Sequence, residues 1–220
     1  MSGATTNRRD VVALVAVVAL LAGFLVLRST IVPDGAQTAV NLALIPCLAV
    51  AALAAGMTAA ELGLAREHVV TGLWWGVQAF LVVALALTVA ASIPARRGLF
   101  DDDRVDVSAG SMLWRALVVI PVATVVMEEL AFRGVLLGLL RRVVDDRPAV
   151  LVASVLFGLW HVPGTLDDGP GAVIGTVLAT AVFGIVLCWL RLGSGSLVAP
   201  VLAHVATNSV AFLLAWVIAP

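Results

Sequence analysis

The fold is decided by residues 69–93, which read VVTGLWWGVQAFLVVALALTVAASI and contain no Asp, Glu, Lys or Arg. A helix of this length and composition matches a lipid bilayer, whose hydrocarbon core of about 30 Å needs about 20 predominantly apolar residues. Four further runs are equally free of charged residues, at positions 11–27, 38–60, 171–190 and 197–218. We therefore expect the chain to cross a membrane several times.

Two weaker runs bring the expected number of spans to seven or eight. Residues 149–162 are uncharged but short, and Pro163 follows them directly. Residues 112–140 have the length of one helix or of two helices that meet near Phe132. Because these runs lack the alternation of a membrane β-barrel, we predict an all-α polytopic membrane helical bundle of seven or eight transmembrane helices. Residues 1–220 are expected to form a single integral-membrane domain.

The composition of the whole chain agrees with a protein surrounded by a lipid bilayer. Hydrophobic residues make up 62% of the 220 residues and charged residues only 12%, whereas a soluble domain carries about 25% charged residues. The formal net charge is -1, so there is no basic surplus and we expect no nucleic-acid partner. The basic residues are all Arg and Tyr is absent, which is typical of a GC-rich prokaryotic genome.

Arginines that flank the apolar runs predict how the chain is inserted. Arg8 and Arg9 precede the first run, and the spans that follow identify this run as a retained transmembrane segment rather than a cleaved signal. With seven spans, more arginines lie on the N-terminal face than on the opposite face. The excess predicts an N-terminus in the cytoplasm and a location in the cell membrane of a prokaryote.

Three G-x-x-x-G spacings predict close helix packing. Small residues of this kind let the backbones of two membrane helices approach each other closely. In a chain with this many spans, we expect the partner helix to belong to the same chain. The three motifs are Gly72 with Gly76, Gly134 with Gly138, and Gly171 with Gly175.

Ionisable residues inside the run 112–140 indicate a functional site. Residues 127–133 read MEELAFR, and a charged group inside a membrane costs about 2.5 to 3.5 kcal/mol, so those that persist usually face a cavity. On a helix, Glu129 and Arg133 lie one turn apart with the acid first, which favours an ion pair. Glu128 points away from that pair, so it is expected to lack a partner and to act as a general base or acid.

Two other apolar runs contribute polar side chains at the spacing of one helical turn. Phe157 precedes His161 by four residues, and His204 precedes Asn208 by four residues. His204 and Asn208 are therefore expected to point at the same neighbouring helix. With seven spans and a rise of about 1.5 Å per residue, these groups and Glu128 fall at similar depths in the bilayer. Similar depth predicts that they form one site.

These residues form three short motifs on successive membrane segments. In this order, the three motifs resemble those of the CAAX protease and bacteriocin-processing (CPBP, or Abi) intramembrane endopeptidases. The resemblance covers residues 112–218, which it identifies as the catalytic core. It implies a helical bundle around a water-filled cavity in the membrane, and hydrolysis of a peptide bond in a membrane-associated protein or peptide. The motifs read Glu128-Glu129-x-x-x-Arg133, Phe157-x-x-x-His161 and His204-x-x-x-Asn208.

The resemblance also implies catalytic roles for four residues. Glu128 would activate a water molecule with the help of His161. His204 and Asn208 would polarise the scissile carbonyl group and stabilise its oxyanion. Hydrogen-bond donors that are preset toward developing charge in this way can be worth about 2.7 to 4 kcal/mol each.

The other three motif residues are expected to support these groups. Glu129 and Arg133 would hold their helix in place and tune Glu128. Phe157 would form a wall of the pocket. No Ser or Cys lies one helical turn from a histidine, so a covalent nucleophile is not indicated.

A zinc site and a metal-free site are both compatible with these residues. Glu128, His161 and His204 would be the three ligands of a catalytic zinc ion, with water as the fourth. The chain lacks the motif H-E-x-x-H, and Asn208 is a poor zinc ligand but a good oxyanion donor. These features favour a site without a metal or other cofactor.

Two other classes of function fit an intramembrane polar cluster. In a proton-coupled transporter, Glu128, His161 and His204 would form a proton relay. Transporters often contain inverted repeats, whereas here the buried ionisable groups all lie after residue 112. In a non-catalytic membrane scaffold or immunity protein, the cluster would serve packing alone.

Overall fold

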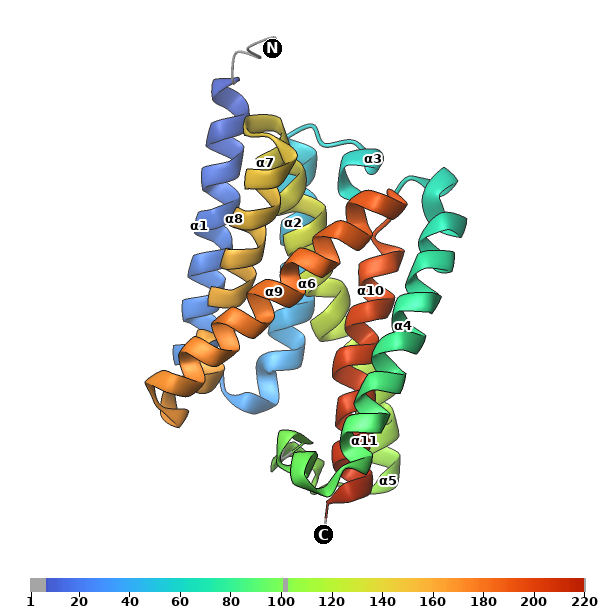
Figure 1. Ribbon diagram of the computed structural model, residues 1–220. Helices are drawn as coiled ribbons and strands as arrows, with labels where there is room; N and C mark the ends of the chain where they lie inside the picture. The colour runs from blue at the N-terminus through green and yellow to red at the C-terminus, as the bar shows by residue number, and fades with distance from the viewer. Residues whose placement is uncertain (1–6, 101–102, 220) are drawn as a thin grey trace.

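The computed structural model describes residues 7–100 and 103–219, and within these ranges it contains helices and no strands. The helices run between two ends of the bundle, with the N-terminus at one end and the C-terminus at the other (Figure 1). Among the described residues, six helical spans are long and apolar enough to cross a membrane, and the number is seven if a bent helix pair counts as one span. The predicted polytopic helical bundle is confirmed.

Three of the spans precede the motif-bearing part of the chain. The first is α1 (Arg8–Thr30), and the second joins a short turn, Asp34–Ala36, to α2 (Gln37–Ala54). The third contains the short α3 (Ala59–Leu62), a 3-10 turn at Arg66–His68, and α4 (Val69–Ser92). Two further 3-10 turns, Pro94–Phe100 and Asp103–Val105, lead from α4 to the motif-bearing part.

The fourth span, Ala109–Val143, is one helical span of 35 residues. The alternative of two helices that meet near Phe132 is therefore wrong, and the described residues form six spans, or seven with the bent pair. The span consists of α5 (Ala109–Trp114), α6 (Met127–Glu129) and α7 (Leu137–Val143), joined by π-helical stretches at Arg115–Val126 and Leu130–Leu136. π-Helical turns are rare and often occur at functional sites; here they lie on both sides of α6.

The remaining spans complete the bundle around the fourth. α8 (Asp146–Leu159) is followed by a 3-10 segment, Val162–Asp168, at an angle of 47°, and the two form the bent pair. α9 (Pro170–Ser194) returns at a steep tilt (Figure 1). The last span contains α10 (Val198–Val205), a π-helical stretch at Ala206–Val210, and α11 (Ala211–Ile218).

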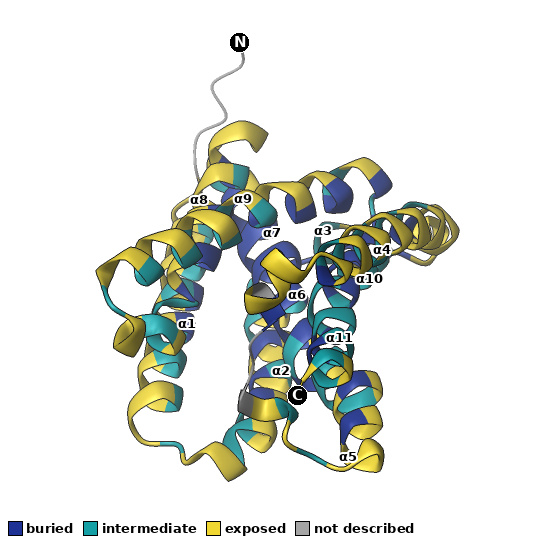
Figure 2. Cartoon of the chain, turned by 60° about the horizontal axis from the view of Figure 1, so that its bottom comes forward, coloured by how far each residue is buried: buried dark blue, intermediate teal, exposed yellow. Residues whose placement is uncertain are grey.

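The core of the bundle surrounds the middle of the fourth span. Met127, Leu136 and Leu139 in this span are fully buried. The outer helices expose long apolar side chains instead, so α4 is largely coloured as exposed, whereas the central helix is coloured as buried (Figure 2). Exposed apolar surface of this extent indicates contact with lipid rather than with water.

Close packing is present at two of the three predicted glycine motifs. A Cβ atom on Gly76 would lie 2.7 Å from a leucine side chain of α10, and one on Gly138 would lie 2.5 Å from the Met57 side chain. Both motifs therefore pack within the chain, as predicted. Gly171 and Gly175 have no described neighbouring atom within 4 Å of the corresponding position, so the prediction is wrong for the third motif.

One arginine at the N-terminal end of the bundle connects four helices. Arg142, in α7, donates hydrogen bonds to both carboxylate oxygens of Glu61, at 2.7 and 2.9 Å, and to the Asp10 carboxylate at 3.1 Å. It also donates to the carbonyl oxygens of Ala55, at 2.9 Å, and Gly56, at 3.1 Å. These contacts join α1, the end of α2, α3 and α7.

We predict that Gly158→Ala destabilises the bundle. Gly158 lies on α8, and a Cβ atom there would lie 2.6 Å from the backbone carbonyl oxygen of Val177 on α9. Relieving the overlap requires the two helices to separate, so the free energy of unfolding should fall by about 1 to 3 kcal/mol. Thermal unfolding of the purified variant measures this loss.

Gly175→Ala is the matched control, because it changes a helical glycine of α9 that has no described neighbour within 4 Å. This variant should be neutral, or more stable by up to about 1 kcal/mol, since Ala has the higher helix propensity. Equal melting temperatures for the two variants would contradict the close contact between α8 and α9.

Candidate active site

Two oppositely charged residues of the first motif form a buried ion pair. The Nη1 atom of Arg133 lies 3.0 Å from Oε1 of Glu129, and the two side chains are 1% and 0% exposed. The ion pair predicted from the one-turn spacing is confirmed. Because this ion pair is buried in the core of the bundle, it is held in place and can orient neighbouring polar side chains.

His204 of α10 binds the same carboxylate oxygen. Its Nδ1 atom lies 2.7 Å from Oε1 of Glu129. A carboxylate oxygen that already accepts from Arg133 serves His204 as an acceptor too, so we assign a proton to Nδ1. The other ring nitrogen, Nε2, faces Glu128 at a distance of 3.8 Å from its Oε2 atom. The imidazole ring therefore lies between two adjacent carboxylates of α6.

Glu128 has a hydrogen-bond partner that the sequence did not predict. Its Oε1 atom accepts a hydrogen bond from Nε1 of Trp160 at 3.0 Å, so the expectation that Glu128 lacks a partner is wrong for this oxygen. Its Oε2 atom is buried and has no hydrogen-bond partner among the described residues; the 3.8 Å to His204 is too long for one. Glu128 thus has one oxygen held in place and one unsatisfied.

Trp160 is the contributor to this site that the motif analysis missed. Its indole ring stacks on Phe24, with 5.9 Å between ring centroids, and meets Phe132 edge to face at 5.5 Å. A buried indole N–H usually finds an acceptor, and Trp160 directly precedes His161 in the sequence. A buried Trp beside a motif histidine therefore indicated that Trp160 could donate a hydrogen bond within the site. The sequence did not identify Glu128 as the acceptor.

The ring of Phe157 connects the two histidines. It makes edge-to-face contacts with His161 at 4.8 Å and with His204 at 5.8 Å between ring centroids. The Arg133 guanidinium lies 4.0 Å from the centre of the same ring, a cation–π contact that adds to the ion pair with Glu129. Phe157 therefore packs between the charged groups of the core and His161.

A cavity of about 340 Å³ reaches His161, whose ring contacts Phe157. His161 and Asn208 line it, together with Thr124, Thr180 and Thr207. Glu128 and His204, in contrast, are almost completely buried, at 3% and 2% exposure. The four residues predicted to be catalytic thus form two adjacent pairs, one buried and one on the cavity wall.

His161 presents a proton acceptor at this cavity. Its Nδ1 atom lies 2.8 Å from the carbonyl oxygen of Phe157. A carbonyl oxygen can only accept, so we assign the proton to Nδ1, which leaves Nε2 as an acceptor.

A π-helical stretch, Ala206–Val210, follows His204 and carries Asn208. His204 contacts Glu129, whereas Asn208 lines the cavity. Thr124, which lines the same cavity, belongs to the fourth span, as Glu129 does, so the expectation that both side chains point at one neighbouring helix stays a prediction.

The arrangement does not fit a zinc site. In the part of the chain that the structure describes, no three His, Cys, Asp or Glu side chains lie close enough together to hold a metal ion. Glu128 and His204 belong to the buried cluster, whereas His161 lies on the cavity wall. These three residues therefore do not form the three-ligand set that a catalytic zinc ion needs.

We predict that Arg133→Leu destabilises the protein strongly. The substitution leaves the fully buried Glu129 without its counter-charge, which should lower the free energy of unfolding by about 3 to 5 kcal/mol. The double variant Glu129→Leu/Arg133→Leu removes both charges and should lose less than the sum of the two single variants. Unfolding monitored in detergent measures all three; strictly additive losses would show that the two charges are not coupled.

Residues 110–210 match the family model described as "Rce1-like: Type II CAAX prenyl endopeptidase Rce1-like". No curated protein and no solved structure matches the chain. The matched segment contains the residues of all three motifs, from Glu128 to Asn208. Over residues 110–210, the chain is therefore similar to the Rce1-like family of type II CAAX prenyl endopeptidases.

Proposed function

We propose that this protein is an intramembrane endopeptidase that hydrolyses a peptide bond in a membrane-associated protein or peptide. The family match supports a protease of the CAAX type. The observation that carries the mechanism is the unsatisfied Oε2 atom of Glu128. A buried acceptor without a donor is costly, and a water molecule entering from the adjoining cavity would supply that donor.

In the proposed first step, Glu128 acts as the general base. Trp160 holds Oε1, so Oε2 is the oxygen that takes a proton from the water molecule. The resulting hydroxide attacks the carbonyl carbon of the scissile bond. His161, whose Nε2 is an acceptor at the cavity wall, helps to orient the attacking water.

In the same step, negative charge develops on the carbonyl oxygen of the substrate. Asn208 lines the cavity and has amide hydrogens to donate to this oxyanion. In its imidazolium form His204 carries a second proton, on Nε2, which faces the space beside Glu128, and this N–H donates to the same carbonyl oxygen. When the tetrahedral intermediate collapses, the proton held by Glu128 passes to the leaving amine, and the C–N bond breaks.

Glu129, Arg133 and Phe157 support this machinery in the proposal. The carboxylate of Glu129 fixes the ring of His204 through Nδ1, and Arg133 balances the charge of that carboxylate. Phe157 forms a wall between the buried pair and the cavity, in contact with both histidines. These residues act on the reaction through the groups that they position.

The broader sequence predictions belong to the same proposal. Residues 112–218 are proposed as the catalytic core of a single domain over residues 1–220, working without a metal. The proposed location is a prokaryotic cell membrane with the N-terminus in the cytoplasm. Support for this orientation comes from the larger share of arginines near the N-terminal end of the bundle.

We predict that Glu128→Gln lowers proteolysis by about 10²- to 10⁴-fold, because the amide cannot accept the proton of the water molecule. Hydrolysis of a membrane-peptide library by the purified protein, with and without chelator, measures the effect. Glu67→Gln, which removes an exposed acid of the turn Arg66–His68, is the control and should keep full activity. Full activity of Glu128→Gln would overturn the general-base role, and loss of wild-type activity to chelator with recovery in zinc would overturn the metal-free mechanism.

We predict a smaller, selective effect for Trp160→Phe. Phenylalanine keeps aromatic contact with Phe24 and Phe132 but cannot donate to Oε1 of Glu128. A hydrogen bond to a charged group is worth about 1.5 to 3 kcal/mol, so kcat should fall by about ten- to one-hundredfold while KM stays within about twofold. A change confined to KM, or to the melting temperature, would show that Trp160 does not position the base.

A further inference from the structure

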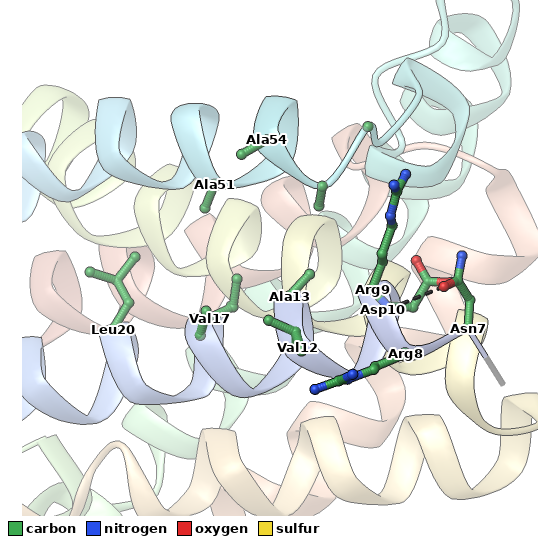
Figure 3. A pocket seen from close by; sticks show the side chains of 13 residues that line it. Asn7, Arg8, Arg9, Asp10, Val12, Ala13, Val17, Leu20, Ala51 and Ala54 are labelled. Carbon is green, nitrogen blue, oxygen red and sulfur yellow. Dashed lines mark hydrogen bonds between the residues drawn. The ribbon is translucent and has the colours of Figure 1, made fainter.

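A second concave site lies at the N-terminal end of the bundle and shares no residue with the candidate active site. It is a groove of about 1060 Å³ between the first turns of α1 and the end of α2 (Figure 3). One of its ends is polar, whereas the rest of its lining is apolar. The groove therefore has the two-part character of a site for an amphiphilic molecule.

Two arginines give the polar end a positive charge. Arg8 and Arg9 both line the groove at the first turn of α1 and extend to different sides of the helix (Figure 3). Both are exposed, and neither forms an ion pair with any residue that the structure describes. The nearby Asp10 does not neutralise them through such a pair, because its carboxylate binds Arg142 at 3.1 Å.

Small and branched apolar side chains form the rest of the groove. Ala13, Ala16 and Val17 of α1 face Ala51 and Ala54 of α2 across it. The short alanine side chains leave the space between the two helices open, and Leu20 lines the inner part. This lining follows two predicted membrane spans inward, so the groove continues from the end of the bundle toward the hydrocarbon core.

We propose that this groove binds an anionic phospholipid, with the headgroup at the polar end that Arg8 and Arg9 line and one acyl chain between α1 and α2. Charge complementarity selects the headgroup, because basic pockets between membrane helices bind anionic lipid headgroups. The apolar lining selects the acyl chain, because alkyl groups are stabilised against apolar surface. A soluble phosphate would use only the first feature, and a neutral amphiphile only the second.

The experiment counts the lipids that remain bound to the full-length protein. The protein is reconstituted in phosphatidylcholine bilayers that contain a minor fraction of phosphatidylglycerol, and native mass spectrometry identifies the lipids retained on release. We expect preferential retention of phosphatidylglycerol by the wild type. Arg8→Gln/Arg9→Gln should reduce it about tenfold or more, since each arginine near the membrane surface contributes to anionic lipid binding.

Two matched controls separate groove binding from general attraction. Arg96→Gln/Arg97→Gln removes two exposed arginines between α4 and the fourth span and should leave retention unchanged. Ala16→Phe fills the groove without altering charge and should reduce retention, whereas Ala19→Phe changes an exposed alanine of α1 that does not line the groove and should not. If Arg8→Gln/Arg9→Gln does not fold, comparison of Ala16→Phe with Ala19→Phe still tests whether the lipid binds in the groove.

Several results would overturn the proposal. Equal retention of phosphatidylcholine and phosphatidylglycerol would mean that charge does not select the ligand. An equal loss in both arginine double variants would indicate nonspecific attraction, and unchanged retention in Ala16→Phe would indicate adsorption outside the groove. Because the readout is bound lipid, it is independent of whether the protein cleaves peptides.

Discussion

The buried oxygen Oε1 of Glu129 accepts hydrogen bonds from two cations or potential cations at once, and the arrangement of the motif helices depends on this shared contact. Arg133 reaches it from one turn farther along the same span, and His204 reaches it from α10. A buried charge is tolerated only when it is paired and hydrogen-bonded. The contact therefore fixes α10 against the fourth span and sets the orientation of the His204 ring.

The irregular helices around this contact give the site its shape. α6 carries the adjacent residues Glu128 and Glu129, and π-helical stretches lie on both sides of it. A third π-helical stretch follows His204 and carries Asn208. Wider turns change the direction of the side chains that follow, so polar groups can be shared between a buried cluster and a cavity. Phe157 packs between the two and contacts both histidines.

The membrane bundle and part of the site could be predicted from the sequence, because they depend on long apolar runs and on the spacing of residues within one helix. Apolar runs of span length predicted the membrane bundle, and the one-turn spacing predicted the ion pair of Glu129 with Arg133. The bond from Trp160 to Glu128 joins residues 32 positions apart, and no local rule predicts such a contact. The π-helical stretches beside α6 and after His204 were missed because π-helical turns have no clear sequence signal. Gly171 and Gly175, which have no described neighbouring atom within 4 Å, show that a packing motif also needs a neighbouring helix.

The contacts of Arg142 imply an order of events during biosynthesis. This side chain follows Asp10 by 132 residues and Glu61 by 81 residues in the chain. When the first three spans enter the membrane, Arg142 has not yet been inserted. The two carboxylates and the carbonyl groups at the end of α2 therefore lack the guanidinium group that later donates to all of them. Only insertion of the fourth span supplies it, so the N-terminal third reaches its final form after the first motif has been synthesised. A ribosome stalled before residue 142 would leave the first three spans without the side chain that joins α1, α2 and α3.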